Sequence, residues 1–150
     1  MIIRSFNEKD IQSVVELLQS CRPFVFPHDE YLYWVLTEYY PSTSFVCEDS
    51  GCIVGFVSGL QSVEQSTIFV WQICIHPAHR RKGLGSRLLK SLFDRIVEDN
   101  LDNMQLSITK ENLSSYQLFE NFAAEHSLTM ELLKTVHVSG SSENVYRICR

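Results

Sequence analysis

The pattern of apolar and polar positions is clearest in the middle of the chain. Thr67–Ile75 is a run of β-branched and aromatic residues, which predicts a buried strand. His76 and Pro77 end this strand, because proline has no N–H to donate to a sheet ladder. The stretch Ile73–Leu89 is predicted to pass from strand through turn to helix. On one face of that helix, apolar side chains recur at Leu88, Leu89, Leu92, Phe93, Ile96 and Val97.

The rest of the chain divides into shorter elements by the same criteria. Helical spacing of apolar residues predicts helices after Asn7, over Glu30–Tyr39 and after Asn112. A hairpin turn is expected at residues 49–51 and a flexible loop at Gly140–Ser142. The predicted order is β-α-α-β-β-β-α-β-α-β-β, in a single domain of residues 1–150. The other strands are expected at Ile2–Ser5, Ser44–Glu48, Cys52–Leu60, Met104–Ile108, Thr129–Val138 and Asn144–Ile148.

Composition is that of an ordinary globular protein that does not bind polyanions. At 150 residues the chain is long enough to bury a core, with 45% of its residues hydrophobic and 21% charged. The net charge of −5 argues against a nucleic-acid partner or an anionic membrane partner. The basic run Arg80–Lys82 is therefore a local feature, suited to a small anionic ligand.

Targeting segments, disulfides and metal sites are not indicated. No apolar run approaches the roughly 20 residues of a membrane span, and the N-terminal residues lack the apolar core of a signal peptide, so a cytoplasmic location is expected. The five cysteines lack C-x-x-C spacing and are expected to be free thiols, although Cys47 and Cys52 flank the hairpin turn and could face each other across it. The five histidines lack metal-ligand spacing, so no metal is predicted.

The turn between the central strand and its helix has the features of an anion site. Gly83 and Gly85 allow the backbone to approach a ligand, and the start of the helix adds unpaired N–H groups and the positive end of its dipole. The run Arg80–Lys82 adds positive charge. The turn lacks the GKS or GKT of a P-loop, and Leu88 stands where GxGxxG needs its third glycine. Phosphate or pyrophosphate is the expected ligand.

This turn resembles the acyl-CoA binding motif of the GNAT acetyltransferases, Q/R-x-x-G-x-G/A, with Arg80, Gly83 and Gly85 at the fixed positions. The predicted element order is also that family's order, so the resemblance covers the whole chain. It implies an α+β fold with a mixed, mostly antiparallel central sheet of six to seven strands, flanked by about four helices and splayed at the acyl-CoA site. It also implies acetyl-CoA as the donor substrate and an amine as the acceptor.

In that family, the strand before the motif separates from its neighbour and acetyl-pantetheine inserts between them, much as an added strand would. The resemblance therefore implies backbone pairing of the donor with Ile73 and Ile75, and an oxyanion-binding N–H near Ile73. Asn112 is explained equally well as a helix cap and as a ligand contact. The donor site implied in this way comprises Ile73, Ile75, Arg80, Arg81, Lys82, Gly83, Leu84, Gly85, Ser86, Asn112 and Phe119.

Five segments more specifically resemble the diaminobutyrate acetyltransferases: GFVSG, FVWQ, PAHRRKGLG, the segment Thr109–Phe119 and ENVYRI. This resemblance implies an amino acid with a side-chain amine as acceptor, and a homodimer. The pattern L-D-x-N-S-x-Y of these enzymes is only partly matched, because its Tyr falls on Tyr31 but its Asp falls on Phe26, with Glu30 close by. The acceptor site is accordingly predicted at Phe26, Asp29, Tyr31, Trp71 and Glu143.

The sequence indicates the groups that transfer protons less clearly than it indicates the donor site. An amine must lose a proton before it attacks, yet the strand before the motif carries Trp71 and Gln72 where many members of the family have a Glu. Glu143 or an ordered water is expected to accept that proton. Phe119 occupies the usual position of the acidic Tyr, so the candidates are Tyr116, one helical turn earlier, or no acid at all, because a thiolate is a good leaving group.

Three functions are consistent with these observations. The first is acetyl-CoA-dependent N-acetylation of a diaminobutyrate-like amine. The second keeps this chemistry but uses another amino acid, a polyamine or an aminoglycoside-like amine, and the change at Phe26 favours it. The third is a non-catalytic acyl-CoA-binding sensor, favoured by the absent strand Glu and the absent Tyr. Trp71 is either plain core or a wall of the acceptor pocket.

Overall fold

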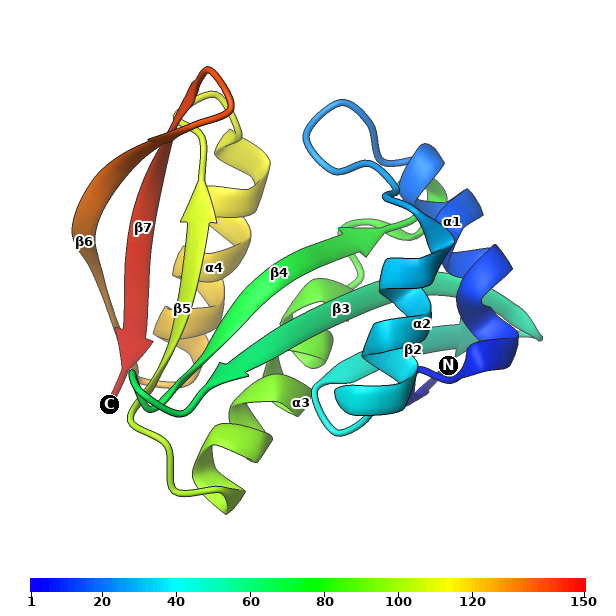
Figure 1. Ribbon diagram of the computed structural model, residues 1–150, viewed down its shortest axis with the longest axis horizontal. Coiled ribbons are helices and arrows are strands. Elements are labelled where there is room, and N and C mark those ends of the chain that lie inside the picture. The colour runs from blue at the N-terminus through cyan, green and yellow to red at the C-terminus, as the bar shows by residue number, and fades with distance from the viewer.

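Helices and strands follow the predicted order in the computed structural model, which describes all 150 residues (Figure 1). Seven strands form one sheet in the order β1-β2-β3-β4-β5-β7-β6, so the predicted α+β fold is confirmed. The strands are β1 (Ile2–Ser5), β2 (Ser44–Asp49), β3 (Cys52–Ser62), β4 (Thr67–Ile75), β5 (Asn103–Ile108), β6 (Thr129–Val138) and β7 (Ser141–Cys149). The helices are α1 (Ile11–Gln19), α2 (Glu30–Tyr39), α3 (Leu84–Glu98) and α4 (Leu113–Glu125), with short 3₁₀ turns η1 (Glu8–Asp10) and η2 (Pro77–His79).

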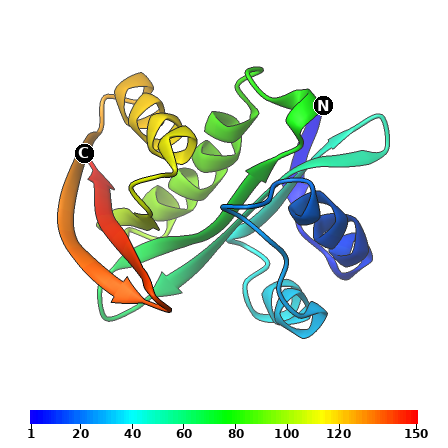
Figure 2. The ribbon, with the colours of Figure 1, turned by 90° about the horizontal axis from the view of Figure 1, so that it is seen from above.

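The four helices lie on both faces of the sheet (Figure 2). α1 and α2 cover one face, where Leu18 and Tyr33 pack with Phe56 of β3 in a buried cluster. α3 and α4 cover the other face, where Leu92 and Phe122 belong to a larger buried cluster with side chains of β3, β4 and β5. Alternating side chains of the central strands thus contribute to two separate cores, which hold β4 firmly from both sides.

β4 and β5 separate halfway along their length. They form the one parallel pair of the sheet, and their register runs only from Thr67 opposite Asn103 to Val70 opposite Leu106. At that point β4 also carries a bulge toward β3, because Ser58 and Gly59 pair with Gln72 and Val70 and leave Trp71 as an extra residue. Figure 1 shows the two strands diverging beyond this position. The splayed sheet predicted from the resemblance is present, and the bulge marks where the opening starts.

Two predictions at the ends of elements are wrong. Gly140–Ser142 is not a flexible loop, because Ser139 and Gly140 have φ angles of 51° and 76° and form a tight hairpin turn, after which β7 begins at Ser141. Val97 does not lie on the buried face of α3. It is 47% exposed, because it follows the buried Ile96 by one residue and so points about 100° away around the helix.

The alternative in which Cys47 faces Cys52 across the β2–β3 hairpin is also wrong. The register places Cys47 opposite Gly55 and Cys52 opposite Asp49. Cys47 is fully buried in the α3 core, whereas Cys52 is exposed. All five cysteines are free thiols in this structure.

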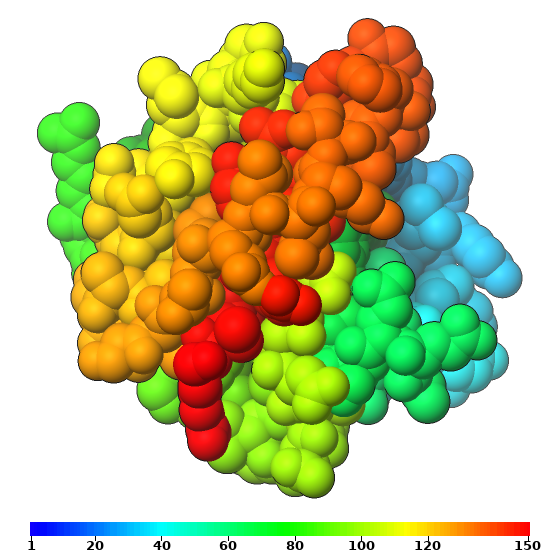
Figure 3. All heavy atoms as spheres, turned by 90° about the vertical axis from the view of Figure 1, so that its left-hand side faces the viewer, coloured from blue at the N-terminus to red at the C-terminus, as the bar shows by residue number.

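β6 forms one outer edge of the sheet and lies across the surface in Figure 3. Leu132, Leu133 and Val138 of this strand are exposed. β6 pairs only with β7, so the backbone groups of its other edge have no partner strand. None of the helices is both long enough and apolar enough to cross a membrane.

Candidate active site

The opening between β4 and β5 leads into two cavities. One, of about 940 Å³, is lined by the turn Arg80–Ser86, the end of β4 and one face of α4, and is called the α3 cavity. The other, of about 570 Å³, lies between β4, β5, the loop Pro23–His28 and the β6–β7 turn, and is called the hairpin cavity. Both are lined by Ile73, Asn112 and Ser115, so they adjoin at the splayed part of β4.

The turn before α3 is built to expose backbone N–H groups to the α3 cavity. Arg81 and Gly83 have left-handed φ angles of 63° and 77°, and α3 begins directly after Gly83 without a side-chain cap. The first N–H groups of the helix therefore stay unpaired by any capping side chain, at the positive end of the helix dipole. Arg80 donates from Nε to the carbonyl of Ile75 at 3.1 Å, which ties the turn to β4.

The two glycines of the motif do different things. An added Cβ at Gly83 would meet nothing within 4 Å, so the residue matters for its left-handed backbone. An added Cβ at Gly85 would lie 2.8 Å from a methyl group of Leu118 on α4. Gly85 therefore also allows α3 and α4 to pack closely, while it lines the α3 cavity.

Positive charge dominates the α3 cavity. Arg22, Arg80 and Arg81 line it, and Glu125 is its one carboxylate. Glu125 accepts a hydrogen bond from the hydroxyl of Ser86 at 2.7 Å. A ligand with several negative charges fits this lining best.

The backbone of β4 presents hydrogen-bonding groups to the opening. Such groups alternate between the two edges of a strand. The N–H of His76 donates to Val54 of β3 at 2.8 Å, so the groups of Ile73 and Ile75 face the other edge, from which β5 has withdrawn. The opening thus offers a strand edge to a ligand that inserts between β4 and β5, as β-strand addition requires.

Cys21 is a residue of the α3 cavity that sequence reasoning did not single out. Its thiol donates to the carbonyl of Ile75 at 3.5 Å and is 8% exposed. A hydrogen bond with the Cys74 thiol lowers the pKa of Cys21 to about 6, helped by Ser20 and Arg80 and opposed by burial. The same hydrogen bond, together with burial, raises the pKa of Cys74 well above its usual value.

Glu143 is the acidic group of the hairpin cavity. It enters from β7, which pairs with β5, and its Oε1 accepts a hydrogen bond from the hydroxyl of Ser107 at 3.4 Å. Its Oε2 is buried and has no hydrogen-bond partner. A buried carboxylate oxygen without a partner is costly unless a bound group supplies a donor, so this atom suits a ligand that carries an N–H or O–H group.

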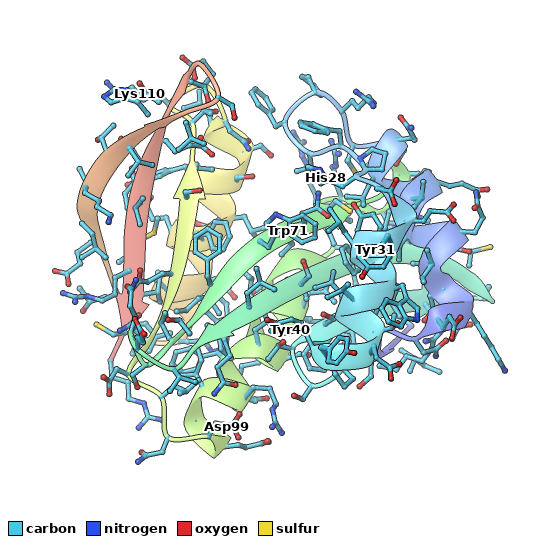
Figure 4. All side chains as sticks on the ribbon, viewed as in Figure 1. His28, Tyr31, Tyr40, Trp71, Asp99 and Lys110 are labelled. Carbon is cyan, nitrogen blue, oxygen red and sulfur yellow. The ribbon has the colours of Figure 1, made fainter.

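The opposite wall of the hairpin cavity is aromatic. The imidazole of His28 stacks on Trp71, with ring centroids 5.2 Å apart, and Phe26 lies 5.4 Å from the imidazole (Figure 4). Trp71 is only half-buried and lines the cavity, so it is a wall of the pocket as well as a partner of the buried Tyr33. No group of three His, Cys, Asp or Glu side chains that could hold a metal ion is present.

The structure brings together only part of the predicted residue set. Ile73, Asn112, Phe119, Trp71, Phe26 and Glu143 line the hairpin cavity, and the whole motif except the exposed Lys82 lines the α3 cavity. Asn112 both lines the cavities and caps α4 by accepting from the N–H of Ser115 at 3.2 Å. Both explanations offered for Asn112 are therefore compatible with its position.

Besides Lys82, three predicted residues lie outside both cavities. Asp29 caps α2 by accepting from the N–H of Tyr31 at 2.8 Å, and the Tyr31 ring is 66% exposed against Trp34. Tyr116 turns away from the opening and packs on Tyr146. Helical spacing explains this, because Tyr116 follows the cavity-lining Ser115 by one residue and so points about 100° away around α4. Sequence reasoning did not assign a role to His28 or Tyr33. The polar Gln72 inside an apolar strand was the one signal that a buried polar contact lies there.

A strand edge opened beside a turn of arginines and uncapped N–H groups, with a carboxylate in the adjoining pocket, is the arrangement that the resemblance to the acetyltransferases led us to expect. The chain belongs to the acetyltransferase (GNAT) family, whose model matches residues 11–123. The protein is thus an enzyme that uses acetyl-CoA as donor and an amine as acceptor.

The chain is similar to several enzymes whose acceptor is known from their names. The chain is 30% identical to the L-2,4-diaminobutyric acid acetyltransferase of Vibrio cholerae, over 98% of this chain and 88% of that protein, and equally to that of Vibrio parahaemolyticus, over 98% and 84%. A solved diaminobutyrate acetyltransferase from Paenibacillus lautus, in complex with L-2,4-diaminobutyric acid and coenzyme A, superposes with a TM-score of 0.88 at 25% identity, covering 99% of this chain and 93% of that one. The ribosomal-protein-S18-alanine N-acetyltransferase of Escherichia coli shares the fold, with a TM-score of 0.76 at 16% identity over 98% and 90% of the two chains.

Proposed function

We propose that this enzyme acetylates one amine of L-2,4-diaminobutyrate. The observation that carries the proposal is the buried, unpartnered Oε2 of Glu143 in the pocket that adjoins the donor cavity at Ile73. A diamino acid has one ammonium to pair with this carboxylate and a second amine to place at the thioester. The relatives named as diaminobutyrate acetyltransferases support the same acceptor.

The donor lies in the α3 cavity in this proposal. The backbone N–H groups of residues 81–86 bind the pyrophosphate, with Arg80, Arg81 and Lys82 adding charge. The pantetheine arm pairs with the free edge of β4 at Ile73 and Ile75, and Asn112 and Phe119 close the other side. The N–H of Ile73 points to the opening and stabilises the oxyanion that forms on the thioester carbonyl.

The acceptor lies in the hairpin cavity. Glu143 pairs with an ammonium group, and Trp71 and Phe26 shape the apolar wall. Hydroxyl donors for a carboxylate come from Ser107, Thr109, Ser115, Ser139 and Ser141. The thiolate of coenzyme A leaves without an acid in this scheme, because Tyr116 packs on Tyr146 and lies outside both cavities.

A second acceptor class is favoured by one observation. Phe26 stands where the subfamily pattern has an Asp, and neither Asp29 nor Tyr31 lines the hairpin cavity. A diamine with a different spacing between its amines, such as ornithine, lysine or a polyamine, is the alternative that this change allows.

Thiol release from acetyl-CoA with a panel of acceptors separates these possibilities. L-2,4-diaminobutyrate is expected to give the highest kcat/KM. 2-Aminobutyrate, which lacks the second amine, and 1,3-diaminopropane, which lacks the carboxylate, serve as matched controls. Faster release with ornithine, lysine or a polyamine would move the assignment to the second class, and equal rates with 2-aminobutyrate would remove the role of Glu143.

We further propose that the enzyme acts in the cytoplasm as a homodimer. Five free thiols, two of which line the donor cavity, suit a reducing compartment. The unpaired edge of β6 and its exposed Leu132, Leu133 and Val138 suit a contact with a second copy.

A further inference from the structure

The hairpin cavity holds one ionisable group to which the proposed function gives no task. Of the residues that line it, only His28 and Glu143 can carry a charge. If Glu143 keeps its negative charge to pair with one ammonium, it cannot also accept a proton from the other. We propose that His28 is the general base, whose imidazole accepts the proton of the attacking amine. The inference rests on the proposed function and deepens it.

The packing of the His28 ring suits this task. Its face stacks on Trp71 at an interplanar angle of 29° (Figure 4). The Phe26 ring is tilted against it at 42°. Stacking on Trp71 leaves the two nitrogens at the edge of the ring uncovered. Neither nitrogen hydrogen-bonds to another group of the protein, so both are available to a substrate in the cavity. An imidazole is also the side chain that changes charge near neutral pH, which general acid–base catalysis requires.

A chain of three hydrogen bonds holds the backbone around His28. The N–H of His28 donates to the Tyr33 hydroxyl at 3.0 Å, and that hydroxyl donates to Oε1 of Gln72 at 3.0 Å. Nε2 of Gln72 then donates to the carbonyl of Phe26, also at 3.0 Å. Tyr33 is fully buried and Gln72 is 7% exposed. The loop is thus fixed to β4 on both sides of Pro27, directly beside the cavity-lining Trp71 and Ile73.

The groups around His28 do not compete for this role. Arg22 lies over the Phe26 ring at 5.7 Å, and the Asp29 carboxylate is engaged in capping α2. Glu30 lies in the first turn of α2, outside the cavity. Burial raises the pKa of Tyr33, so its hydroxyl stays protonated. Glu143 is the one charged group that shares the cavity.

The proposed step transfers one acetyl group and moves two protons from the amine. The ammonium of the acceptor gives one proton to His28, and its lone pair forms the C–N bond to the acetyl carbonyl. The tetrahedral intermediate collapses, the C–S bond breaks, and the thiolate of coenzyme A accepts the second proton from nitrogen. The products are the N-acetylated acceptor and free coenzyme A, and the imidazolium returns its proton to solvent, to which His28 is exposed.

The test compares two variants of the full-length enzyme. His28→Phe keeps a ring between Phe26 and Trp71, and His28→Gln keeps a polar side chain if the first variant folds poorly. Both are expected to lower kcat with L-2,4-diaminobutyrate about 100-fold at neutral pH, to leave the KM for acetyl-CoA unchanged and to lose the acidic limb of the kcat/KM profile. His126→Asn, at the end of α4 and outside both cavities, is the control that keeps this limb.

A second acceptor separates a base from a structural role. Hydroxylamine is largely neutral at neutral pH and needs no base. Once its uncatalysed reaction with acetyl-CoA is subtracted, the defect of His28→Phe should therefore largely disappear with it. An equal defect with both acceptors, or an unchanged pH profile, would overturn the role of His28 and leave the proposed function intact. If the unmodified enzyme released no thiol with any amine, the proposed function would fail and the role of His28 with it.

Discussion

At the scale of single residues, Gly83 shows how one backbone conformation makes a binding site. Its left-handed φ of 77° ends the turn and starts α3 with N–H groups that no side chain caps. Gly83→Ala should therefore strain the turn by about 1–2 kcal/mol and weaken acetyl-CoA binding in isothermal titration calorimetry. Gly51→Ala is the matched control, because Gly51 has a φ of 83° and equally open surroundings in the β2–β3 turn. Equal affinities in the two variants would show that the turn does not bind the donor.

Glu143 makes the complementary prediction for the acceptor. Glu143→Gln keeps the shape of the side chain but removes the charge that pairs with an ammonium. A charge-assisted hydrogen bond contributes about 1.5–3 kcal/mol, so the KM for the diamine should rise about 10- to 100-fold while acetyl-CoA affinity is unchanged. Glu131→Gln, on β6 and bonded to Arg147 outside both cavities, is the control. An unchanged KM in Glu143→Gln would remove this carboxylate from the acceptor site.

At the scale of elements, the junction of β1 with α1 depends on Asp10. Its carboxylate accepts two hydrogen bonds from Arg4, at 2.8 and 2.9 Å, and one from the N–H of Asn7 in a capping box. Burial of the carboxyl raises its pKa, but these hydrogen bonds outweigh burial and lower it overall. Because the pKa is lower in the folded than in the unfolded state, the carboxylate stabilises the fold above the unfolded pKa.

Asp10→Asn should thus lower the free energy of unfolding by about 1–3 kcal/mol at neutral pH. The difference from the unmodified protein should shrink in acid and vanish as the pH falls through the folded pKa of Asp10. Urea denaturation at several pH values measures it. Asp102→Asn, an exposed residue before β5, should show neither effect. A difference that persists in strong acid would mean that the charge of Asp10 is not the cause.

The elements also show what the sequence could predict. Strong periodicity identified β4, α3 and the order of all the elements, because apolar residues there recur at the spacing of their own structure. The bulge at Trp71 and the end of β4–β5 pairing at Val70 could not be predicted from the sequence. Both depend on the register between strands, which local periodicity does not specify. The loop Pro23–His28 has no periodicity, so nothing in it showed that His28 would stack on Trp71.

At the scale of the whole molecule, the edge of β6 makes a prediction about assembly. Leu132 is 56% exposed on this unpaired strand. The unmodified protein is expected to elute as a dimer in size-exclusion chromatography with light scattering, and Leu132→Glu as a monomer, because a buried charge would oppose the contact. Val63→Glu, at an 86% exposed site in the β3–β4 connection, should remain a dimer. A monomeric unmodified protein would contradict the homodimer.

The proposed activity requires the two cavities, which adjoin at Ile73, to act as one site. A single-turnover experiment tests this most directly. Enzyme loaded with acetyl-CoA is mixed with L-2,4-diaminobutyrate, and free thiol and product are followed together by absorbance and mass spectrometry. The prediction is release of one thiol for each molecule of monoacetylated diaminobutyrate formed. Absence of release, or release with free acetate as the product, would contradict it.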